Sequence, residues 1–336
     1  MSNALVDRST PRQYHPQPSD SDMIFTPLSH LPTPLDDAPR LTAELSPGAT
    51  GRLRILIKRD DLTGLAMGGN KARKLDYLMR DAVEKGCNTV VTAGGAQSNF
   101  ARMTAAASAK LGIACHLVLS GDAPAHDSGN ILLDRIFGAE LHFAGTDDWD
   151  VLWAEVQRIA AGIGPRAYPM PIGGATPVGS LGYVAAADEI LSQMDAPPDW
   201  IVHATSSGGT QAGLLAGLPR EVRVLGIDVA RPKTPLTVSV PKLAARTAAL
   251  ANRPPPAGEV IIADHCGPYY ASITEEAQQA VRRAARTEAL VLDPVYSGKA
   301  MAGLIAAAKS GRLSGTVVFL HTGGAPALFA DEFASF

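Results

Sequence analysis

Residues 67–76 read Met-Gly-Gly-Asn-Lys-Ala-Arg-Lys-Leu-Asp, and the rest of the chain is organised around this stretch. Gly68 and Gly69 permit a tight turn, and a helical pattern begins at about Ala72. The turn would hold the amine of Lys71 at the start of a helix, where it could meet a phosphate, a metal-bound substrate or a carbonyl carbon. The alternative is an ordinary turn-to-helix junction without chemistry.

Length and composition describe an ordinary globular protein. The 336 residues are enough for two domains or for one large α/β domain. The formal net charge of −3 gives no reason to expect nucleic acid or an anionic membrane as a partner. No apolar run approaches the roughly 20 residues that span a bilayer. Residues 1–22 lack the apolar core of a secretory signal, so we expect them to form a flexible arm.

Cysteines and histidines give no metal motif. Cys87, Cys115 and Cys266 lie far apart and form neither a metal-binding spacing nor a disulfide framework, which suits a reducing cytoplasm. The histidines show no pair at i, i+4 and no neighbouring carboxylate that suggests a metal, so no metal site is predicted. His203 and His321, each at the end of a predicted strand, are expected to be packed in the core.

Strand and helix patterns alternate along the chain. Short apolar runs predict strands at residues 53–58, 89–92, 114–119, 140–143, 200–204, 222–229, 291–292 and 317–321. Apolar residues at helical spacing predict helices at 72–85, 100–111, 130–137, 149–163, 182–194, 211–218, 233–252, 274–288 and 298–309. This alternation is typical of parallel sheets with helices on both faces. Two α/β units with a cleft between them are the simplest interpretation, and ligands in such folds bind outside the carboxyl ends of the strands.

Two polar loops, each between a strand and a helix, are candidate binding sites. Residues 205–210, Thr-Ser-Ser-Gly-Gly-Thr, bring backbone N–H groups and hydroxyls to a helix N-terminus, which suits a phosphate. This loop lacks both the Walker spacing and Gly-x-Gly-x-x-Gly, and a tight turn is the alternative. Gln97, Ser98 and Asn99 could bind a carboxylate or a ring oxygen, with a helix N-cap as the alternative.

A third loop, residues 293–299 (Asp-Pro-Val-Tyr-Ser-Gly-Lys), places Tyr296 ahead of a helix. This tyrosine could transfer a proton, although a partly buried structural tyrosine is the commoner case. The chain thus offers a lysine that could form a Schiff base, a phosphate loop about 135 residues later and a Ser-Asn loop between them. Pyridoxal phosphate needs all three features.

Five motifs resemble those of the D-cysteine desulfhydrase and 1-aminocyclopropane-1-carboxylate (ACC) deaminase family. They are residues 57–61 (Ile-Lys-Arg-Asp-Asp), 66–71 (Ala-Met-Gly-Gly-Asn-Lys), 97–99 (Gln-Ser-Asn), 293–296 (Asp-Pro-Val-Tyr) and 321–328 (His-Thr-Gly-Gly-Ala-Pro-Ala-Leu). They occur in the family's order, and the resemblance extends from about residue 32 to residue 329.

The resemblance implies an α/β enzyme of fold type II, the tryptophan-synthase-β type, which binds pyridoxal phosphate. Such a fold has two open, twisted, mostly parallel sheets with flanking helices and a cleft between them. Residues 23–75 and 173–336 would form a large cofactor domain, and residues 76–172 a small mobile domain. Relatives are commonly dimers, so a homodimer is expected.

The resemblance also assigns the cofactor contacts. Lys71 is similar to the Schiff-base lysine, Lys74 to a phosphate contact, and Asn99 to the residue that binds the cofactor's ring oxygen. One loop would hold the phosphate through Ser207, Gly208, Gly209 and Thr210.

The substrate would lie against the Ser-Asn loop and two tyrosines. Ser98 would hold the substrate carboxylate or act in proton transfer. Tyr296 would face the substrate and could also transfer a proton. The other implied substrate contacts are Gln97, Asn99, Phe100 and Tyr270.

Two positions divide the family. Its ring-opening deaminases carry a glutamate after the loop tyrosine and a leucine before the final Gly-Gly, whereas this chain has Ser297 and Thr322, the desulfhydrase pattern. A neutral hydroxyl beside the pyridine nitrogen makes the ring a weaker electron sink, which elimination tolerates better than reactions that need a long-lived carbanion. Desulfhydrases usually read Gln-Ser-Asn-His and continue to Arg-Gln, whereas this chain has Phe100 and Met103. If both line the pocket, two polar contacts become apolar.

The sequence therefore predicts a cytoplasmic, pyridoxal-phosphate-dependent lyase that performs α,β-elimination on a small amino acid. By resemblance its reaction is that of D-cysteine desulfhydrase, which yields pyruvate, ammonia and sulfide. The alternatives are ACC deamination, β-replacement or racemisation of another amino acid and, from a different class, a catalytically silent nucleotide binder. No metal, nucleic acid or membrane is expected as a partner.

Overall fold

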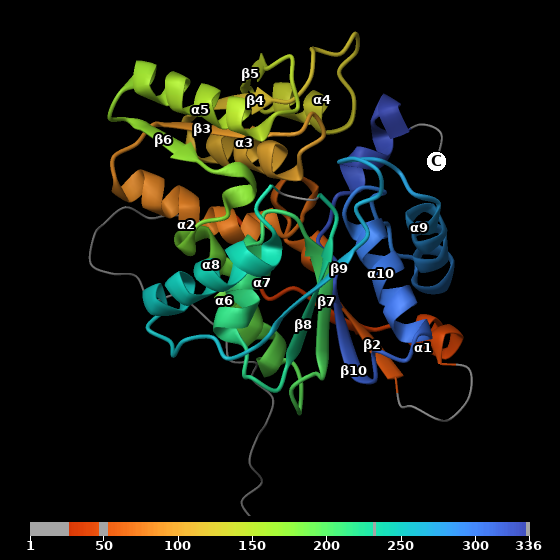
Figure 1. Ribbon diagram of the computed structural model, residues 1–336. Helices are drawn as coiled ribbons and strands as arrows, with labels where there is room; N and C mark the ends of the chain where they lie inside the picture. The colour runs from red at the N-terminus through yellow and green to blue at the C-terminus, as the bar shows by residue number, and fades with distance from the viewer. Residues whose placement is uncertain (1–26, 47–52, 231–232, 334–336) are drawn as a thin grey trace, which may run out of the picture.

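The computed structural model describes residues 27–46, 53–230 and 233–333. In these ranges ten strands form two sheets, which lie in different parts of the molecule (Figure 1). The flexible arm predicted for residues 1–22 lies outside the described residues.

The larger sheet has six strands. In spatial order they are β1 (Leu35–Asp37), β2 (Leu53–Lys58), β10 (Gly315–Leu320), β7 (Trp200–Thr205), β8 (Arg223–Asp228) and β9 (Val260–Asp264). Strand β1 runs antiparallel to β2, and every other neighbouring pair is parallel. Successive side chains of a strand point to opposite faces, so Ile55 and Ile57 of β2 join one core and Leu56 joins another.

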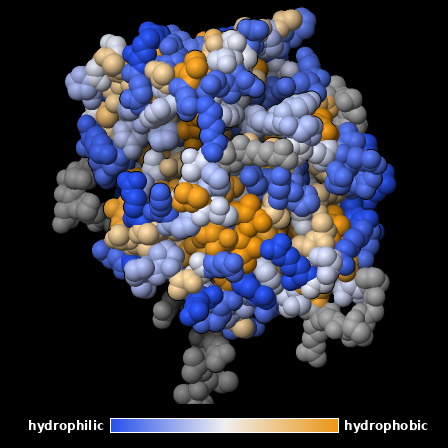
Figure 2. All heavy atoms as spheres, viewed as in Figure 1, coloured by the Kyte–Doolittle hydropathy of each residue, from blue (hydrophilic) through white to orange (hydrophobic). Residues whose placement is uncertain are grey.

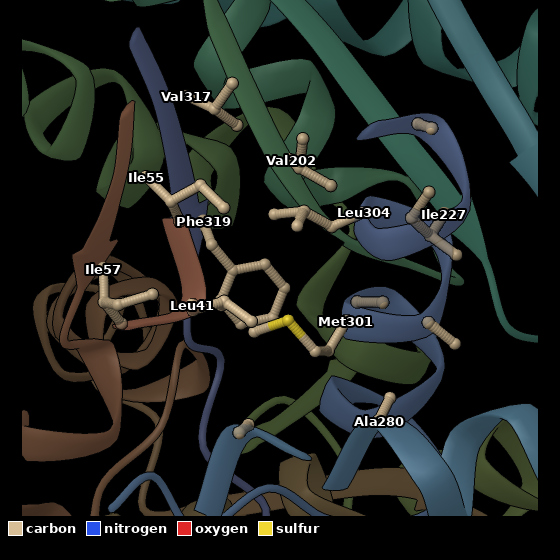
Figure 3. Close-up of a cluster of buried hydrophobic side chains, with 14 of the residues drawn as sticks. Leu41, Ile55, Ile57, Val202, Ile227, Ala280, Met301, Leu304, Val317 and Phe319 are labelled. Carbon is tan, nitrogen blue, oxygen red and sulfur yellow. The ribbon is translucent and has the colours of Figure 1, made fainter. Parts of the chain in front are cut away.

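Helices cover both faces of this sheet. One face packs against α1 (Pro39–Leu45), α9 (Glu275–Glu288) and α10 (Ser297–Lys309). The other packs against α6 (Pro177–Ser192), α7 (Gly209–Gly217) and α8 (Leu236–Leu250). Figure 3 shows the first core, where Phe319 of β10 lies beside Leu41 of α1 and Met301 of α10. Sheets buried on both faces read as continuous apolar runs, which is why these strands were visible in the sequence.

The smaller sheet has four parallel strands. In spatial order they are β5 (Glu140–Phe143), β4 (Ala114–Leu119), β3 (Thr89–Gly94) and β6 (Ala167–Met170). Helices α2 (Lys71–Glu84), α3 (Asn99–Leu111) and α4 (Gly129–Ile136) cover one face, and α5 (Trp149–Ile163) covers the other. Helix α2 also packs on α6, so it joins the two halves of the molecule (Figure 1).

Both sheets direct the carboxyl ends of strands toward one cavity. Its lining includes residues at or just after the ends of β3, β6, β7, β8 and β10. This is where ligands bind in open α/β sheets. None of the helices in the described ranges has the length and apolar character that a bilayer crossing requires.

The predicted fold class is confirmed, with some differences in its elements. Residues 291–292 form no strand, because they join neither ladder; Leu292 is instead a buried side chain of the first core. Strands β1, β6 and β9 and helix α1 were not predicted. The strands of the small sheet all fall within residues 76–172, and the division into a large and a small mobile domain stays a prediction.

The outer surface is mainly hydrophilic in the view of Figure 2, with apolar groups gathered below the centre. An apolar region of this kind suits packing against another protein surface. The expected homodimer stays a prediction.

Candidate active site

The turn before Lys71 can be made only by glycines. Gly68 has φ +73°, and a Cβ there would lie 1.8 Å from the carbonyl oxygen of Asp61. Gly69 has φ +135°, and its N–H donates to the carbonyl oxygen of Asp60 at 2.9 Å. Because the chain turns this tightly, Lys71 becomes the first residue of α2.

Contacts from distant elements hold this turn in a strained conformation. Ala66 and Met67 have φ of +45° and +66°, a region that costs a residue with a side chain about 1–2 kcal/mol. Arg102 of α3 donates from Nη2 to the carbonyl oxygen of Gly68 at 3.1 Å. The N–H of Asn70 donates to the carbonyl oxygen of Thr322 at 3.1 Å. The strained segment is therefore fixed from both halves of the molecule.

Burial makes Lys71 a reactive amine. Its side chain lines the cavity, and removal from water lowers the pKa of its amine to about 8, an effect that the nearby Asp293 opposes. Lys74, one turn later, is fully buried, and burial together with the charge of Lys71 holds the pKa of its amine well below the ordinary range. Lys74 Nζ donates to the carbonyl oxygen of Gly173 at 3.0 Å. Neither amine forms an ion pair with a carboxylate among the described residues, so these two lysines suit a ligand that carries negative charge.

The predicted phosphate loop leads into α7. Gly208 caps this helix with φ +80°, and a Cβ on Gly209 would lie 2.8 Å from Lys74 Nζ. The helix N-terminus therefore lies next to a buried lysine amine. Asn70 Nδ2 donates to Thr210 Oγ1 at 3.1 Å, which ties the loop to the Lys71 turn. The buried hydroxyl of Thr205, another lining residue, has no hydrogen-bond partner in the described structure.

The Ser-Asn loop faces the same cavity. Ser98 caps α3, and its Oγ accepts a hydrogen bond from the N–H of Ala101 at 3.2 Å, so the N-cap alternative describes this contact. The hydroxyl proton remains to be donated toward the cavity. Asn99 Oδ1 accepts from Asn130 Nδ2 at 3.2 Å, which leaves the amide N–H groups of Asn99 as donors.

Two tyrosines from the large-sheet half of the molecule meet at the cavity. The hydroxyls of Tyr270 and Tyr296 are hydrogen-bonded to each other, and the Tyr270 ring packs edge-on against Trp149 with centroids 5.4 Å apart. Burial raises the pKa of Tyr270 to about 12 and holds the pKa of Tyr296 well above its ordinary value. Both hydroxyls are therefore protonated at neutral pH and can act as proton donors.

Asp293 positions Tyr296, and the sequence analysis assigned it no role. Its Oδ1 accepts the N–H groups of Val295 at 2.8 Å and Tyr296 at 2.6 Å. Its Oδ2 accepts the N–H of Ser297 at 2.9 Å and the Ser297 hydroxyl at 2.6 Å. An aspartate four residues before a helix, which accepts the N–H group two residues later, is a recognisable Asx-type signal that could have identified it.

The cavity has a volume of about 260 Å³ and brings most of the predicted residues together. Those that line it are Lys71, Ser98, Asn99, Phe100, Ser207, Gly208, Thr210, Tyr270, Tyr296 and Thr322. Trp149, Asp150 and Lys233, which carried no motif, line it as well.

Five residues of interest from the sequence lie outside this lining. Lys74 and Gly209 lie beside each other directly behind it. The Gln97 side chain binds the N–H of Asn130 and the carbonyl oxygen of Ser128. The Ser297 hydroxyl is engaged by Asp293 rather than directed to the cavity. Met103 is buried behind Gly69, so only Phe100 of the two apolar replacements contacts the cavity.

His203 and His321 are packed in the core, as predicted. They are 0% and 1% exposed, and burial lowers the pKa of both imidazoles, that of His203 to about 4.

Comparison with known proteins agrees with this geometry. The model of the family described as pyridoxal-phosphate dependent enzyme matches residues 27–323. The chain belongs to this family of pyridoxal-phosphate-dependent enzymes. It is 38% identical to a 1-aminocyclopropane-1-carboxylate deaminase of Rhizobium leguminosarum bv. viciae, over 90% of this chain and 94% of that protein. It is 41% identical to a D-cysteine desulfhydrase of Klebsiella pneumoniae strain 342, again over 90% and 94%.

A solved structure described as an ACC deaminase homologue is also similar. It superposes with a TM-score of 0.84 at 39% identity, over 92% of this chain and 94% of that one. The predicted family and cofactor are confirmed, and the protein is an enzyme of the ACC deaminase and D-cysteine desulfhydrase type.

The residues present fit pyridoxal phosphate. The orphaned hydroxyl of Thr205 and the free N–H groups at the start of α7 lie at the cavity, and a buried cation lies beside them. A dianionic phosphate needs such a set of donors and cations, and the amine of Lys71 lines the same cavity.

Proposed function

We propose that this enzyme catalyses α,β-elimination from a small amino acid, with D-cysteine as the model substrate. D-cysteine and one water would give pyruvate, ammonia and hydrogen sulfide. Thr322 carries the proposal: it puts a neutral side chain at the cavity, and no carboxylate stands at position 297 to hold a proton on a ring nitrogen. A ring left unprotonated favours departure of a leaving group over a long-lived carbanion.

The proposed cofactor contacts follow from the cavity. Lys71 would hold the cofactor covalently, and the N-terminus of α7 with Ser207, Gly208, Gly209 and Thr210 would hold its phosphate. Lys74 would neutralise part of the phosphate charge, and the amide of Asn99 would donate to the ring oxygen. When bound, pyridoxal phosphate withdraws electrons from the substrate's α carbon.

Two side chains would transfer protons, Lys71 as the acceptor and Tyr296 as the donor. The amine of Lys71, with its pKa lowered to about 8, has a neutral fraction at physiological pH that can accept the α proton at Nζ. Tyr296 keeps its proton because burial raises its pKa, so its hydroxyl can protonate the departing sulfur. Tyr270 would restore that proton through the shared hydrogen bond. The hydroxyl of Ser98 would bind the substrate carboxylate.

ACC deamination is the second candidate, and Phe100 favours it. ACC and water would give 2-oxobutyrate and ammonia. Phe100 is 2% exposed and contributes an aromatic wall to the cavity, which suits the apolar methylene groups of a cyclopropane ring better than a thiol. The two candidates therefore rest on different residues of one cavity.

One assay distinguishes them. The purified holoenzyme is supplied with D-cysteine, L-cysteine or ACC, and pyruvate, sulfide and 2-oxobutyrate are measured separately. Sulfide and pyruvate in equal amounts from D-cysteine support the proposal, whereas 2-oxobutyrate from ACC without sulfide release refutes it in favour of ring opening. Lys71→Ala is the blank for both reactions.

A pair of substitutions tests the pocket wall itself. Phe100→His restores a polar group at a position that lines the cavity, and it should raise kcat/KM for D-cysteine relative to ACC by at least about tenfold. Met103→Gln is the matched control, because this side chain lies behind Gly69 and not in the lining. Equal shifts in both variants would show that the wall does not set specificity. The cytoplasmic location and the homodimer also stay predictions.

A further inference from the structure

Three metal-binding side chains converge on the small sheet, outside the active-site cavity. His116 Nδ1 lies 3.1 Å from His142 Nε2. The carboxylate of Glu140 lies across both rings, with Oε2 3.5 Å from His116 Nδ1 and Oε1 3.5 Å from His142 Nε2. The two imidazole rings are nearly parallel, with centroids 5.4 Å apart.

Strand pairing builds this cluster. His116 lies on β4 directly opposite Glu140 of the edge strand β5, and Val118 lies opposite His142. Residues two apart on a strand share a face, so His116, Glu140 and His142 point to the same side of the sheet. That is also the side of α5, because Val118 packs into the core that α5 forms. Sequence spacing alone did not suggest it, since 26 residues separate the two histidines.

The nitrogens of His116 and His142 lie within hydrogen-bond distance of each other, but the spacing of the Glu140 carboxylate fits one small cation better than a hydrogen bond. At 3.5 Å each carboxylate oxygen is too far for a good hydrogen bond to an imidazole N–H. Ligand atoms of a tetrahedral ion with bonds of about 2.0–2.1 Å lie about 3.3 Å apart. The nitrogens lie 3.1 Å apart and each lies 3.5 Å from a different oxygen of Glu140, distances that bracket that value, and one ligand atom from each residue lies within 4.8 Å of the others. Small movements would bring all three groups onto a common centre.

We propose that His116, Glu140 and His142 bind a divalent metal ion of the Zn²⁺ class. Two imidazoles and one carboxylate are the ligand set that zinc accepts, whereas Mg²⁺ and Ca²⁺ prefer oxygen ligands alone. The imidazoles are 19% and 27% exposed and Glu140 is 65% exposed, so an ion can enter from solvent. A water molecule would take the fourth position, from an open groove lined by His142, Val151 and Glu155.

The site would fasten the edge of the small sheet. β5 has one neighbouring strand in the described sheet, and the ion would join it to β4 through side chains as well as backbone. None of the three ligands lines the active-site cavity. Metal binding should therefore stabilise the protein without being needed for turnover.

The test is Zn²⁺ titration of untagged holoenzyme against a chromophoric chelator. Wild type should bind one Zn²⁺ per chain at this site. His142→Gln and Glu140→Gln should each weaken that binding by at least about tenfold, since loss of even an outer partner of a metal site costs about 10–100-fold. His126→Gln is the control, because this exposed histidine of the same half of the molecule is not part of the cluster. It should bind like wild type.

Thermal unfolding gives an independent readout. Zn²⁺ should raise the melting temperature of wild type and of His126→Gln clearly more than that of Glu140→Gln at the same concentration; Glu140 is exposed, so this variant should fold normally. Binding of equal strength in wild type, His142→Gln and Glu140→Gln, or no binding in wild type, would overturn the proposal. Mg²⁺ in place of Zn²⁺ should have no effect, and stabilisation by Mg²⁺ equal to that by Zn²⁺ would also overturn it.

Discussion

Asp293 offers the sharpest test of how the loop with Tyr296 is held. Its buried carboxylate accepts four hydrogen bonds, two at each oxygen, from Val295, Tyr296 and Ser297. In Asp293→Asn, the amide oxygen can keep one pair of these bonds. The new NH₂ group then faces the Ser297 N–H, and two donors cannot bond.

The expected loss of stability follows from the number of hydrogen bonds that Asp293→Asn would break. A hydrogen bond to a charged group contributes about 1.5–3 kcal/mol, and a buried donor left without an acceptor costs about 1–3 kcal/mol. The Ser297 hydroxyl can rotate and accept from the amide, so that contact is largely kept. We therefore expect Asp293→Asn to lower the free energy of unfolding by about 2–4 kcal/mol. Urea titration of the holoenzyme measures this, with Asp195→Asn as a control at an exposed aspartate.

A second readout separates electrostatics from simple loosening. The charge of Asp293 raises the pKa of Lys71 and opposes the effect of burial. Its removal should shift the pH midpoint for recombination of cofactor-free protein with pyridoxal phosphate to lower pH. Wild-type stability, turnover within twofold of wild type and an unshifted midpoint would together refute the role assigned to Asp293.

Three further predictions concern the turn at Gly68 and the lysine that follows it, Lys71. Lys71→Ala should lose the visible absorption band that borohydride removes and all turnover, whereas Lys85→Ala, at a surface ion pair, should keep both. Gly68→Ala should cost more than about 2 kcal/mol, because its Cβ would meet the Asp61 carbonyl oxygen, while Gly86→Ala, also at positive φ but in open space, should cost about 1 kcal/mol; thermal unfolding compares them. The rate at which cofactor-free protein recombines with limiting cofactor should rise about tenfold from pH 7 to pH 9, as expected for an amine with a pKa of about 8 that loses its proton on this path. A rise of about 100-fold would indicate an unperturbed lysine.

The sequence predicts best where one local pattern decides the structure. Strands β4 and β5 were predicted at their observed bounds: β4 is a short, largely apolar run, β5 alternates polar and apolar residues, and each ends just ahead of a glycine. Strand β9 was missed although it contains the apolar run Val-Ile-Ile-Ala, because it follows a Pro-rich segment typical of irregular chain; as an edge strand it is only half-buried. The run at residues 291–292 has the same local character as a strand but no partner strand.

The site residues, too, could be predicted where neighbouring residues determine them and not where distant contacts do. Lys71 and the α7 loop could be predicted, because in each case glycines lie at the start of a helix and the signal is carried by neighbouring residues in the sequence. The orientation of Ser297 could not, because it depends on how Asp293 closes the loop. The cluster of His116, Glu140 and His142 depends on the register between two strands, which sequence spacing does not reveal.

Helix α2 begins with three cations in four residues, Lys71, Arg73 and Lys74, at the end where the helix dipole is already positive. Among the described residues, Arg73 is the one of the three that forms ion pairs with carboxylates. Arg73 donates to Asp60 at 2.8 and 2.9 Å and to Glu189 at 2.8 and 2.9 Å.

Lys71 and Lys74, three residues apart and therefore on a common face, point away from that network toward the cavity and the α7 loop. Burial lowers the pKa of both amines, and the charge of Lys71 lowers the pKa of Lys74 further, a cost that folding alone does not recover. Placing two amines at a helix N-terminus is unfavourable for the folded chain alone, and such an arrangement is expected where a bound ligand offsets the unfavourable charge. A phosphate beside Lys74 and a carbonyl carbon at Lys71 would remove both penalties together, so the cofactor should stabilise this helix end as well as perform chemistry there.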